Sequence, residues 1–174
     1  MATVNEDGGI THPVIVKSLV WSNEAATQQF ARALARSPAL RQAYVELAGE
    51  LGAGKTTLVR YLLQDLGEEG LIKSPTYAMV EEYELPSMMA WHFDFFRFKA
   101  AYEWEDAGFR EIFATPGLKL AEWANRVSGL APAADLVIAI EVAPNASRQI
   151  TLQAQSATGL ALLTAVFAKA SDAA

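Results

Sequence analysis

A phosphate-binding loop at residues 49–56 constrains the fold of this chain more than any other part of its sequence. The residues read Gly-Glu-Leu-Gly-Ala-Gly-Lys-Thr, which satisfies the pattern G-x-x-x-x-G-K-[ST] at every fixed position. An apolar stretch, Tyr44–Ala48, precedes the loop, and a helix-like run follows it at residues 57–63. A strand, a glycine loop and a helix in that order are typical of a nucleotide-binding P-loop. The sequence therefore predicts an α/β fold with a nucleotide site at the end of a strand.

The positions of this loop have distinct predicted tasks. The backbone N–H groups converge on phosphate oxygens, and the positive end of the following helix adds to their field. The Lys55 ammonium reaches the β and γ phosphates, and the Thr56 hydroxyl binds Mg²⁺. Side chains at Gly52 and Gly54 would obstruct the phosphates. Glu50 is expected to point away, because a carboxylate among these amides would repel the nucleotide. The residues predicted to bind the nucleotide are Gly49, Glu50, Leu51, Gly52, Ala53, Gly54, Lys55, Thr56 and Thr57.

Length and composition indicate one compact domain. The chain has 174 residues, of which 52% are hydrophobic and 20% are charged. We expect a single domain over residues 14–168, with flexible segments at residues 1–13 and 169–174. No cysteine is present, which excludes disulfides, zinc–thiolate sites and thiol catalysis. No apolar run approaches the roughly 20 residues that span a bilayer, and the polar start is unlike a secretory signal, so no membrane contact and a cytoplasmic location are expected.

The distribution of charge indicates which kinds of partner the chain can bind. The net charge is −6, and the 14 Lys and Arg residues are scattered without two in a row. Proteins that bind nucleic acid by themselves cluster such residues on one surface. Direct binding to a nucleic acid is therefore not expected, whereas a Mg-nucleotide is compatible with the local positive field of the loop.

The remaining pattern predicts a mixed sheet between helices. Strands are expected at residues 14–20, 44–48, 77–85, 88–96, 118–123, 135–142 and 148–155. Helices are expected from an N-cap at Ser22 to near Ser37, at residues 55–66 with a cap at Gly67, and as one or two short helices at 103–114. Residues 160–169 fit a helix or a strand equally. This order predicts a P-loop NTPase-like three-layer sandwich with a mixed β-sheet.

Hydrolysis needs more than a phosphate loop. An acidic residue must hold Mg²⁺ or its water shell, and another group must orient the attacking water. The first candidate segment is Ser74-Pro75-Thr76, where a hydroxyl beyond the proline could sense the γ-phosphate, as switch segments do. The same three residues are also compatible with an ordinary turn.

Two further segments carry carboxylates. In a strand, His92 and Asp94 share one face, which suits Mg²⁺–water coordination or proton handling. An edge strand with these two residues facing solvent explains the pattern equally well. Glu122 ends an apolar run, which is the physical form of a Walker B acid, although surface glutamates are common.

Taken together, these segments resemble the TsaE family, the small P-loop ATPases of bacterial tRNA threonylcarbamoyladenosine (t6A) synthesis. The resemblance spans roughly residues 14–155. It rests on an acid-Leu-Gly-Ala-Gly-Lys-Thr-Thr loop, a Ser-Pro-Thr-aromatic element, a His-x-Asp-x-x-Arg strand end, an acidic helix with a Gly-Phe pair, and a Glu-Trp pair. In this chain these are residues 50–57, 74–77, 92–97, 105–109 and 122–123.

The resemblance implies a Mg²⁺-dependent ATPase that serves a protein complex. Lys55 and Thr56 would bind phosphate and Mg²⁺, Thr76 would act as a switch-type sensor, and Asp94 and Glu122 would be the metal-binding and water-orienting carboxylates, in either order. The implied partners are TsaD and TsaB, which carry out the transfer to tRNA, so tRNA is contacted only indirectly. Trp123 is expected to pack against the nucleotide, a partner or the core.

Two other functions are compatible with a P-loop. A small-molecule kinase closes an arginine-rich lid over two substrates, but residues 128–149 hold only Arg148. A nucleotide-binding regulatory module without important turnover is the other alternative. No Asn-Lys-x-Asp guanine-reading element is present, which favours ATP over GTP.

Overall fold

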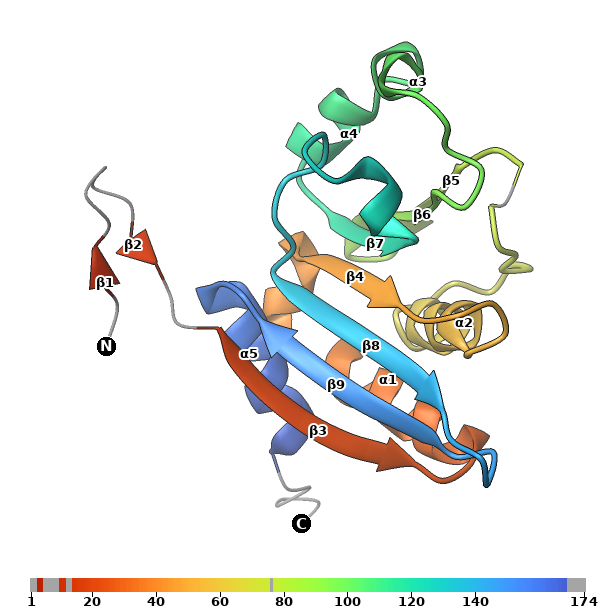
Figure 1. Ribbon diagram of the computed structural model, residues 1–174, viewed down its shortest axis with the longest axis vertical. Coiled ribbons are helices and arrows are strands. Elements are labelled where there is room, and N and C mark those ends of the chain that lie inside the picture. The colour runs from red at the N-terminus through yellow and green to blue at the C-terminus, as the bar shows by residue number, and fades with distance from the viewer. Residues whose placement is uncertain (1–2, 5–9, 12–13, 76, 169–174) are drawn as a thin grey trace.

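Seven strands form the main sheet, in the order β3-β9-β8-β4-β7-β6-β5 (Figure 1). The computed structural model describes residues 3–4, 10–11, 14–75 and 77–168 of the chain. The strands of this sheet are β3 (Ile15–Trp21), β4 (Tyr44–Ala48), β5 (Val80–Leu85), β6 (Met88–Asp94), β7 (Leu118–Glu122), β8 (Leu136–Val142) and β9 (Arg148–Ala154). A separate antiparallel pair is formed by β1 (Thr3–Val4) and β2 (Ile10–Thr11).

The sheet is mixed, as the sequence predicts. β4 is parallel to β7 and β8, and β6 is parallel to β7. β9 is antiparallel to β3 and β8, and β5 is antiparallel to β6. The carboxyl ends of β3, β8, β4, β7 and β6 therefore meet at one edge of the sheet. In open α/β sheets this edge is where ligands bind.

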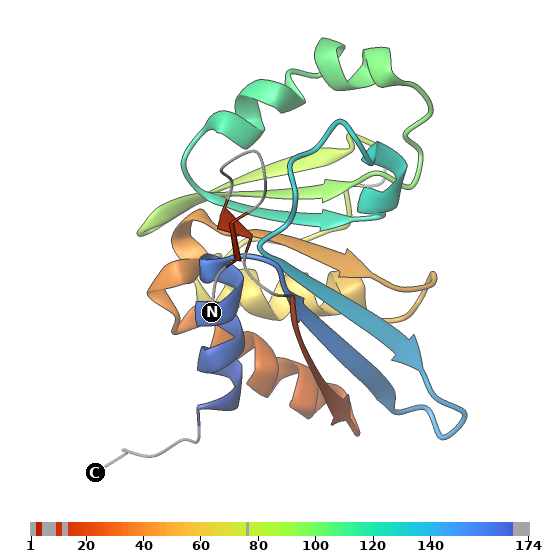
Figure 2. The ribbon, with the colours of Figure 1, turned by 60° about the vertical axis from the view of Figure 1, so that its left-hand side comes forward.

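Helices cover both faces of the sheet (Figures 1 and 2). The longer ones, on one face, are α1 (Glu24–Ala35), α2 (Lys55–Asp65) and α5 (Ala157–Phe167), and the shorter ones, over β5, β6 and β7 on the other face, are α3 (Ala101–Asp106) and α4 (Phe109–Ala114). Two 3₁₀ helices connect elements, η1 (Pro38–Gln42) and η2 (Ala124–Val127). The α/β sandwich of the sequence analysis is confirmed.

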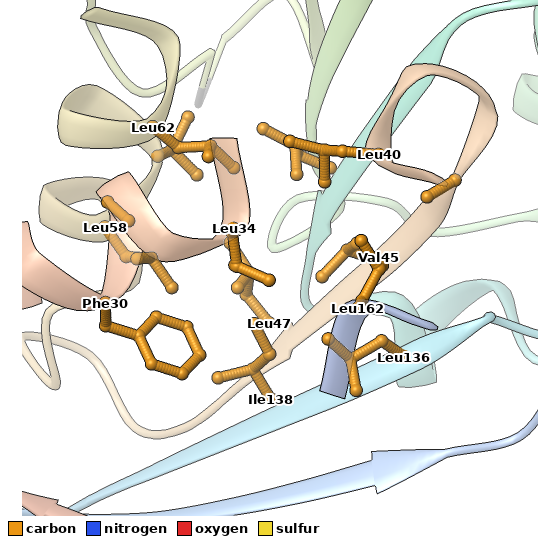
Figure 3. Close-up of a cluster of buried hydrophobic side chains, with 14 of the residues drawn as sticks. Phe30, Leu34, Leu40, Val45, Leu47, Leu58, Leu62, Leu136, Ile138 and Leu162 are labelled. Carbon is orange, nitrogen blue, oxygen red and sulfur yellow. The ribbon is translucent and has the colours of Figure 1, made fainter. Parts of the chain in front are cut away.

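An aliphatic core fills the space between the sheet and the long helices (Figure 3). β4 contributes Val45 and Leu47, α1 contributes Leu34, and α2 contributes Leu58, each at most 2% exposed. Burying a side chain of this size stabilises the fold by about 1.5–3 kcal/mol relative to leaving it in water. This core fixes the strand before the phosphate loop and the helix after it.

An aromatic core lies on the opposite face. Phe93 of β6 packs between Phe95 and Phe113, with ring centroids 5.4 and 5.0 Å away. Trp104 of α3 and Phe109 of α4 complete the cluster, 5.5 Å apart. β6 is therefore held on both faces, which fixes the position of its carboxyl end at the ligand-binding edge.

Most predicted elements are confirmed with small shifts at their ends. The helix N-cap is Asn23 and not Ser22, because the Asn23 side chain accepts a hydrogen bond from the Ala26 N–H at 3.0 Å. α2 is capped by Leu66, and Gly67 follows it with φ +105°, where glycine is favoured. Among the described residues, no helix is long and apolar enough to cross a membrane. The predicted flexibility of residues 1–13 and 169–174 stays a prediction.

Candidate active site

The phosphate loop connects the carboxyl end of β4 to the first residue of α2. Gly52 and Gly54 have φ of +79° and +114°, and a Cβ on either would meet no protein atom within 4 Å. These two glycines therefore supply backbone freedom and leave open space above the loop. Glycine is needed at position 49 for a different reason, since a Cβ there would lie 2.5 Å from the Ile140 carbonyl oxygen. The first amides of α2 have no partner within the helix, so they are available to an anion.

Lys55 folds back over the loop that it ends. Its ammonium donates to the carbonyl oxygens of Gly49 at 2.6 Å and Glu50 at 2.9 Å. The same nitrogen lies 4.6 Å from the centroid of the Trp123 ring. Burial lowers the pKa of Lys55, while the carboxylates of Glu122, Asp94 and Glu50 act in the opposite direction. The lysine is thus positioned as a fixed positive charge inside the loop.

Glu122 connects the loop to the sheet. Its Oε1 accepts a hydrogen bond from the Thr56 hydroxyl at 2.8 Å and lies 2.9 Å from His92 Nε2. Glu122 is 3% exposed and His92 is fully buried. An ionised carboxylate only accepts, so the Nε2–H tautomer of His92 would donate in this contact. The Nδ1 of His92 is buried and has no hydrogen-bond partner among the described residues.

Asp94 lies next to Glu122 across the pair of strands β6 and β7. Its Oδ2 accepts from the Ser74 hydroxyl at 2.8 Å, and its Oδ1 accepts from the Phe96 N–H at 3.0 Å. β6 lies between β7 and β5, so it is not an edge strand. The interpretation of His92 and Asp94 as solvent-facing residues of an edge strand is therefore wrong.

A cavity of about 320 Å³ lies above the loop, and many of the predicted site residues line it, although Gly49, Glu50 and Ala53 do not. They come from the loop, from the ends of β6 and β7, and from Ser74, the first residue of the predicted switch segment. The lining includes Lys55, Thr56, Thr57, Ser74, Asp94 and Glu122. The structure thus brings together two acids, a lysine and hydroxyl groups that are far apart in the sequence. We call this space the phosphate cavity.

The side chains in the phosphate cavity fit a magnesium ion that is completed by its substrate. Mg²⁺ prefers oxygen ligands and is usually held by one or two carboxylates together with phosphates and water. Thr56, Glu122 and Asp94 supply such oxygens here. No group of three or more acidic or histidine side chains in the described part of the chain could hold a metal by itself. An ion held by these three side chains would need further oxygen ligands, such as phosphates and water.

Other residues that the sequence analysis named lie around this cavity or outside the described part of the chain. Thr76, predicted as the sensor, lies outside the residues that the structure describes. Glu50 is exposed, in line with a side chain that points away from the phosphates. Trp123 has φ +59°, a conformation that is uncommon for a bulky residue, and its ring contacts Phe96 at 5.1 Å. The hydrogen bond from Ser74 to Asp94 was not predicted, because the signal in that segment favoured the hydroxyl after the proline.

Residues 21–150 match the family model described as threonylcarbamoyl adenosine biosynthesis protein TsaE. The chain belongs to the TsaE family. The tRNA threonylcarbamoyladenosine biosynthesis protein TsaE of Haemophilus influenzae is 40% identical to it, over 79% of this chain and 87% of that protein. The TsaE protein of Bacillus subtilis is 36% identical, over 62% of this chain and 67% of that protein.

A solved structure agrees with this family. The crystal structure of YdiB from Bacillus subtilis superimposes with a TM-score of 0.74. It covers 89% of this chain and 96% of YdiB, at 26% sequence identity. The family model and the two TsaE proteins confirm the TsaE resemblance of the sequence analysis, and the match to YdiB confirms the fold.

Proposed function

We propose that this protein is a Mg²⁺-dependent ATPase needed for the t6A modification of tRNA, acting on a TsaB–TsaD complex. The TsaE family, with its relatives named for threonylcarbamoyladenosine biosynthesis, supports the pathway. The observation that carries ATP hydrolysis is the hydrogen bond from the Thr56 hydroxyl to Glu122 at 2.8 Å. It joins a phosphate loop to a strand-terminal acid, as nucleotide hydrolysis requires.

In this proposal the residues of the loop bind and orient the triphosphate. The loop amides and Lys55 hold the β and γ phosphates, and Lys55 offsets charge that develops during cleavage. Mg²⁺, held by Thr56 with Glu122 or Asp94, would supply further charge neutralisation at the phosphates. The remaining carboxylate would orient the attacking water. Their burial, at 3% and 4% exposure, keeps bulk water away from both acids.

The partner complex is proposed to complete the site. No described arginine lines the phosphate cavity, so a stabilising cation for the transition state would come from elsewhere. The chain alone should therefore hydrolyse ATP slowly. Leu51, at the tip of the loop, is 80% exposed and offers an apolar contact to a docked protein. The net charge of −6 agrees with tRNA being bound by the partners, and a cytoplasmic location is part of this proposal.

The deciding experiment measures ATP hydrolysis by the purified chain with and without TsaB and TsaD. We expect slow turnover alone and a marked increase with the pair. Lys55→Ala should abolish nucleotide binding, whereas Glu122→Ala should keep binding and lose turnover. Rapid hydrolysis that the pair leaves unchanged would contradict the partner role. Phosphate transfer to a nucleoside or sugar would indicate a kinase, and equal complex function with ATP, ADP and a non-hydrolysable analogue would indicate a regulatory module.

A further inference from the structure

A cavity of about 440 Å³ lies at the carboxyl end of β6, and we call it the basic cavity. Three of the 14 basic residues of the chain line it, namely Arg97, Lys99 and Arg126. Arg97 and Lys99 follow β6, and Arg126 belongs to η2, which lies beside that segment (Figure 2). The fold therefore gathers cations that are scattered along the sequence of a chain with a net charge of −6.

The charges of these three cations are not neutralised within the described part of the chain. All three residues are exposed, and none of them takes part in a salt bridge between described residues. The guanidinium of Arg97 lies 4.5 Å from the centroid of the Tyr77 ring, and that of Arg126 lies 5.9 Å from the centroid of the Phe96 ring. A guanidinium that packs on a ring keeps the N–H donors at its edge available for a carboxylate.

The basic cavity shares Phe96 with the phosphate cavity. The centroid of the Phe96 ring lies 5.1 Å from that of the Trp123 ring, and the Trp123 ring centroid lies 4.6 Å from the Lys55 ammonium. A group that binds Arg126 is therefore separated from the lysine of the phosphate loop by only two aromatic rings in contact with each other.

Two residues that line the basic cavity also hold Asp94, one of the two proposed catalytic acids. The Phe96 N–H donates to Asp94 Oδ1 at 3.0 Å, and the Met79 carbonyl oxygen accepts from the Asp94 N–H at 2.9 Å. A ligand that moves Met79 or Phe96 would therefore also move the Asp94 carboxylate. The basic cavity is thus connected to the proposed site of hydrolysis through the backbone as well as through the rings.

The lining of the basic cavity favours a protein segment over a nucleic acid. Met79, Phe96 and Phe98 offer apolar contacts, and Glu103 places a carboxylate among the cations. A nucleic-acid backbone presents a continuous row of phosphates, and proteins that bind it present a larger basic surface. Three cations beside an acid, on a chain of net negative charge, match such a row poorly. Separate carboxylates with apolar side chains between them match this lining better.

On the basis of the function proposed above, we propose that the basic cavity binds an acidic segment of the protein partner and that this contact raises the rate of ATP hydrolysis. Leu51, the exposed apolar residue of the phosphate loop, lines the phosphate cavity together with Phe96. A partner that contacts Leu51 and covers the phosphate cavity therefore reaches the basic cavity as well. There its carboxylates pair with Lys99 and Arg126, and its apolar side chains pack on Phe96.

The test measures binding of the chain to the purified TsaB–TsaD pair by calorimetry, with Mg²⁺ and a non-hydrolysable ATP analogue, at low and at high salt. Lys99→Glu and Arg126→Glu should each weaken binding about tenfold or more at low salt, because each places a negative charge against the acidic segment. The affinity of the unaltered chain should also fall more steeply with salt than that of either variant. Lys17→Glu makes the same change of charge on β3, at the far edge of the sheet and outside both cavities, and should bind as the unaltered chain does.

ATP hydrolysis tests the second part of the proposal. Without the pair, Lys99→Glu and Arg126→Glu should hydrolyse ATP as fast as the unaltered chain, because neither residue lines the phosphate cavity. At saturating concentrations of the pair, both variants should still be stimulated less than the unaltered chain. Both residues are exposed, so both variants should fold, and their melting temperatures check this.

The outcomes separate the role of the basic cavity from the proposed function. If the unaltered chain neither binds the pair nor is stimulated by it, the proposed partner role is wrong, and the role of the basic cavity is wrong with it. If the unaltered chain binds the pair and both variants bind it and are stimulated equally well, only the role of the basic cavity is overturned. That role is also overturned if the chain alone binds a tRNA transcript and both variants lose this binding, because the basic cavity would then be a nucleic-acid surface.

Discussion

Glu122 is proposed to bind Mg²⁺ or to orient the attacking water. A substitution that removes the N–H donor of His92 tests whether this buried histidine positions Glu122. The imidazole lies 2.9 Å from Glu122, which is the acid that also accepts from Thr56 at 2.8 Å. In His92→Leu the hydrogen bond from Thr56 is the one that the carboxylate keeps among the described residues. In His92→Gln a terminal amide N–H lies about as far along the side chain as Nε2, so the donor is retained.

The magnitude follows from the kind of hydrogen bond that is lost. A hydrogen bond to a charged group contributes about 1.5–3 kcal/mol, and each 1.36 kcal/mol of barrier is about tenfold in rate. If the whole contribution is lost in the transition state, His92→Leu lowers kcat about 10- to 150-fold. Nucleotide affinity should change little, because the loop amides and Lys55 hold the phosphates. The Mg²⁺ concentration at half-maximal rate should rise, since Glu122 is less well placed.

The assay is ATP hydrolysis as a function of ATP and of Mg²⁺, with the melting temperature of each variant. His92→Gln should recover most of kcat, which a purely structural role for the ring would not require. Two results would refute the reasoning. One is an unchanged kcat in His92→Leu, and the other is an equal loss in both variants at normal melting temperatures.

Two further substitutions test the loop and the sheet. Gly49→Ala should destabilise the protein by about 2–6 kcal/mol, because φ is +150° and the added Cβ lies 2.5 Å from the Ile140 carbonyl oxygen. Chemical denaturation measures this, and Gly129→Ala, with φ +82° and no neighbour within 4 Å, should cost less; equal costs would contradict the steric reason. Burial raises the pKa of the Glu46 carboxyl in the folded protein. The contribution of this group to folding stability is therefore complete below its unfolded pKa, and it is lost as the pH rises through the folded pKa. Glu46→Gln should therefore raise the melting temperature at pH 7 and have little effect near pH 4, and a gain that is independent of pH would argue against burial as the cause.

The sequence predicted best where local chemistry decides the structure. β4 was predicted at its observed residues, Tyr44–Ala48, because an apolar run before a glycine loop has few other interpretations. α2 begins at Lys55 as expected, since Gly54, with φ +114°, ends the loop directly before it. Residues 160–169 could not be decided from periodicity. The structure forms α5 there, and its Ser156 N-cap accepts from the Gly159 N–H at 3.0 Å, a signal that the sequence did contain.

Long-range pairing is what the sequence could not supply. Asp94 and Glu122 were each selected as acids at strand ends, yet their adjacency depends on the parallel register of β6 and β7. No local pattern indicates that register. The same holds for Lys99 and Arg126, which line one cavity because β6 pairs with β7. Neither residue has a motif of its own, so sequence reasoning did not place them together.

The sheet register therefore determines the chemistry as much as the loop does. β4, β7 and β6 are parallel neighbours, so their carboxyl ends place the loop, Glu122 and Asp94 side by side. The two faces of the sheet matter equally. Because successive side chains of a strand point to opposite faces, Glu122 and His92 lie on the α2 side and Phe93 lies in the aromatic core. A shift of one residue in β6 would exchange these faces and bury a phenyl ring beside Thr56. The aromatic packing of Phe93 prevents that shift, which makes a core side chain responsible for the position of the polar site.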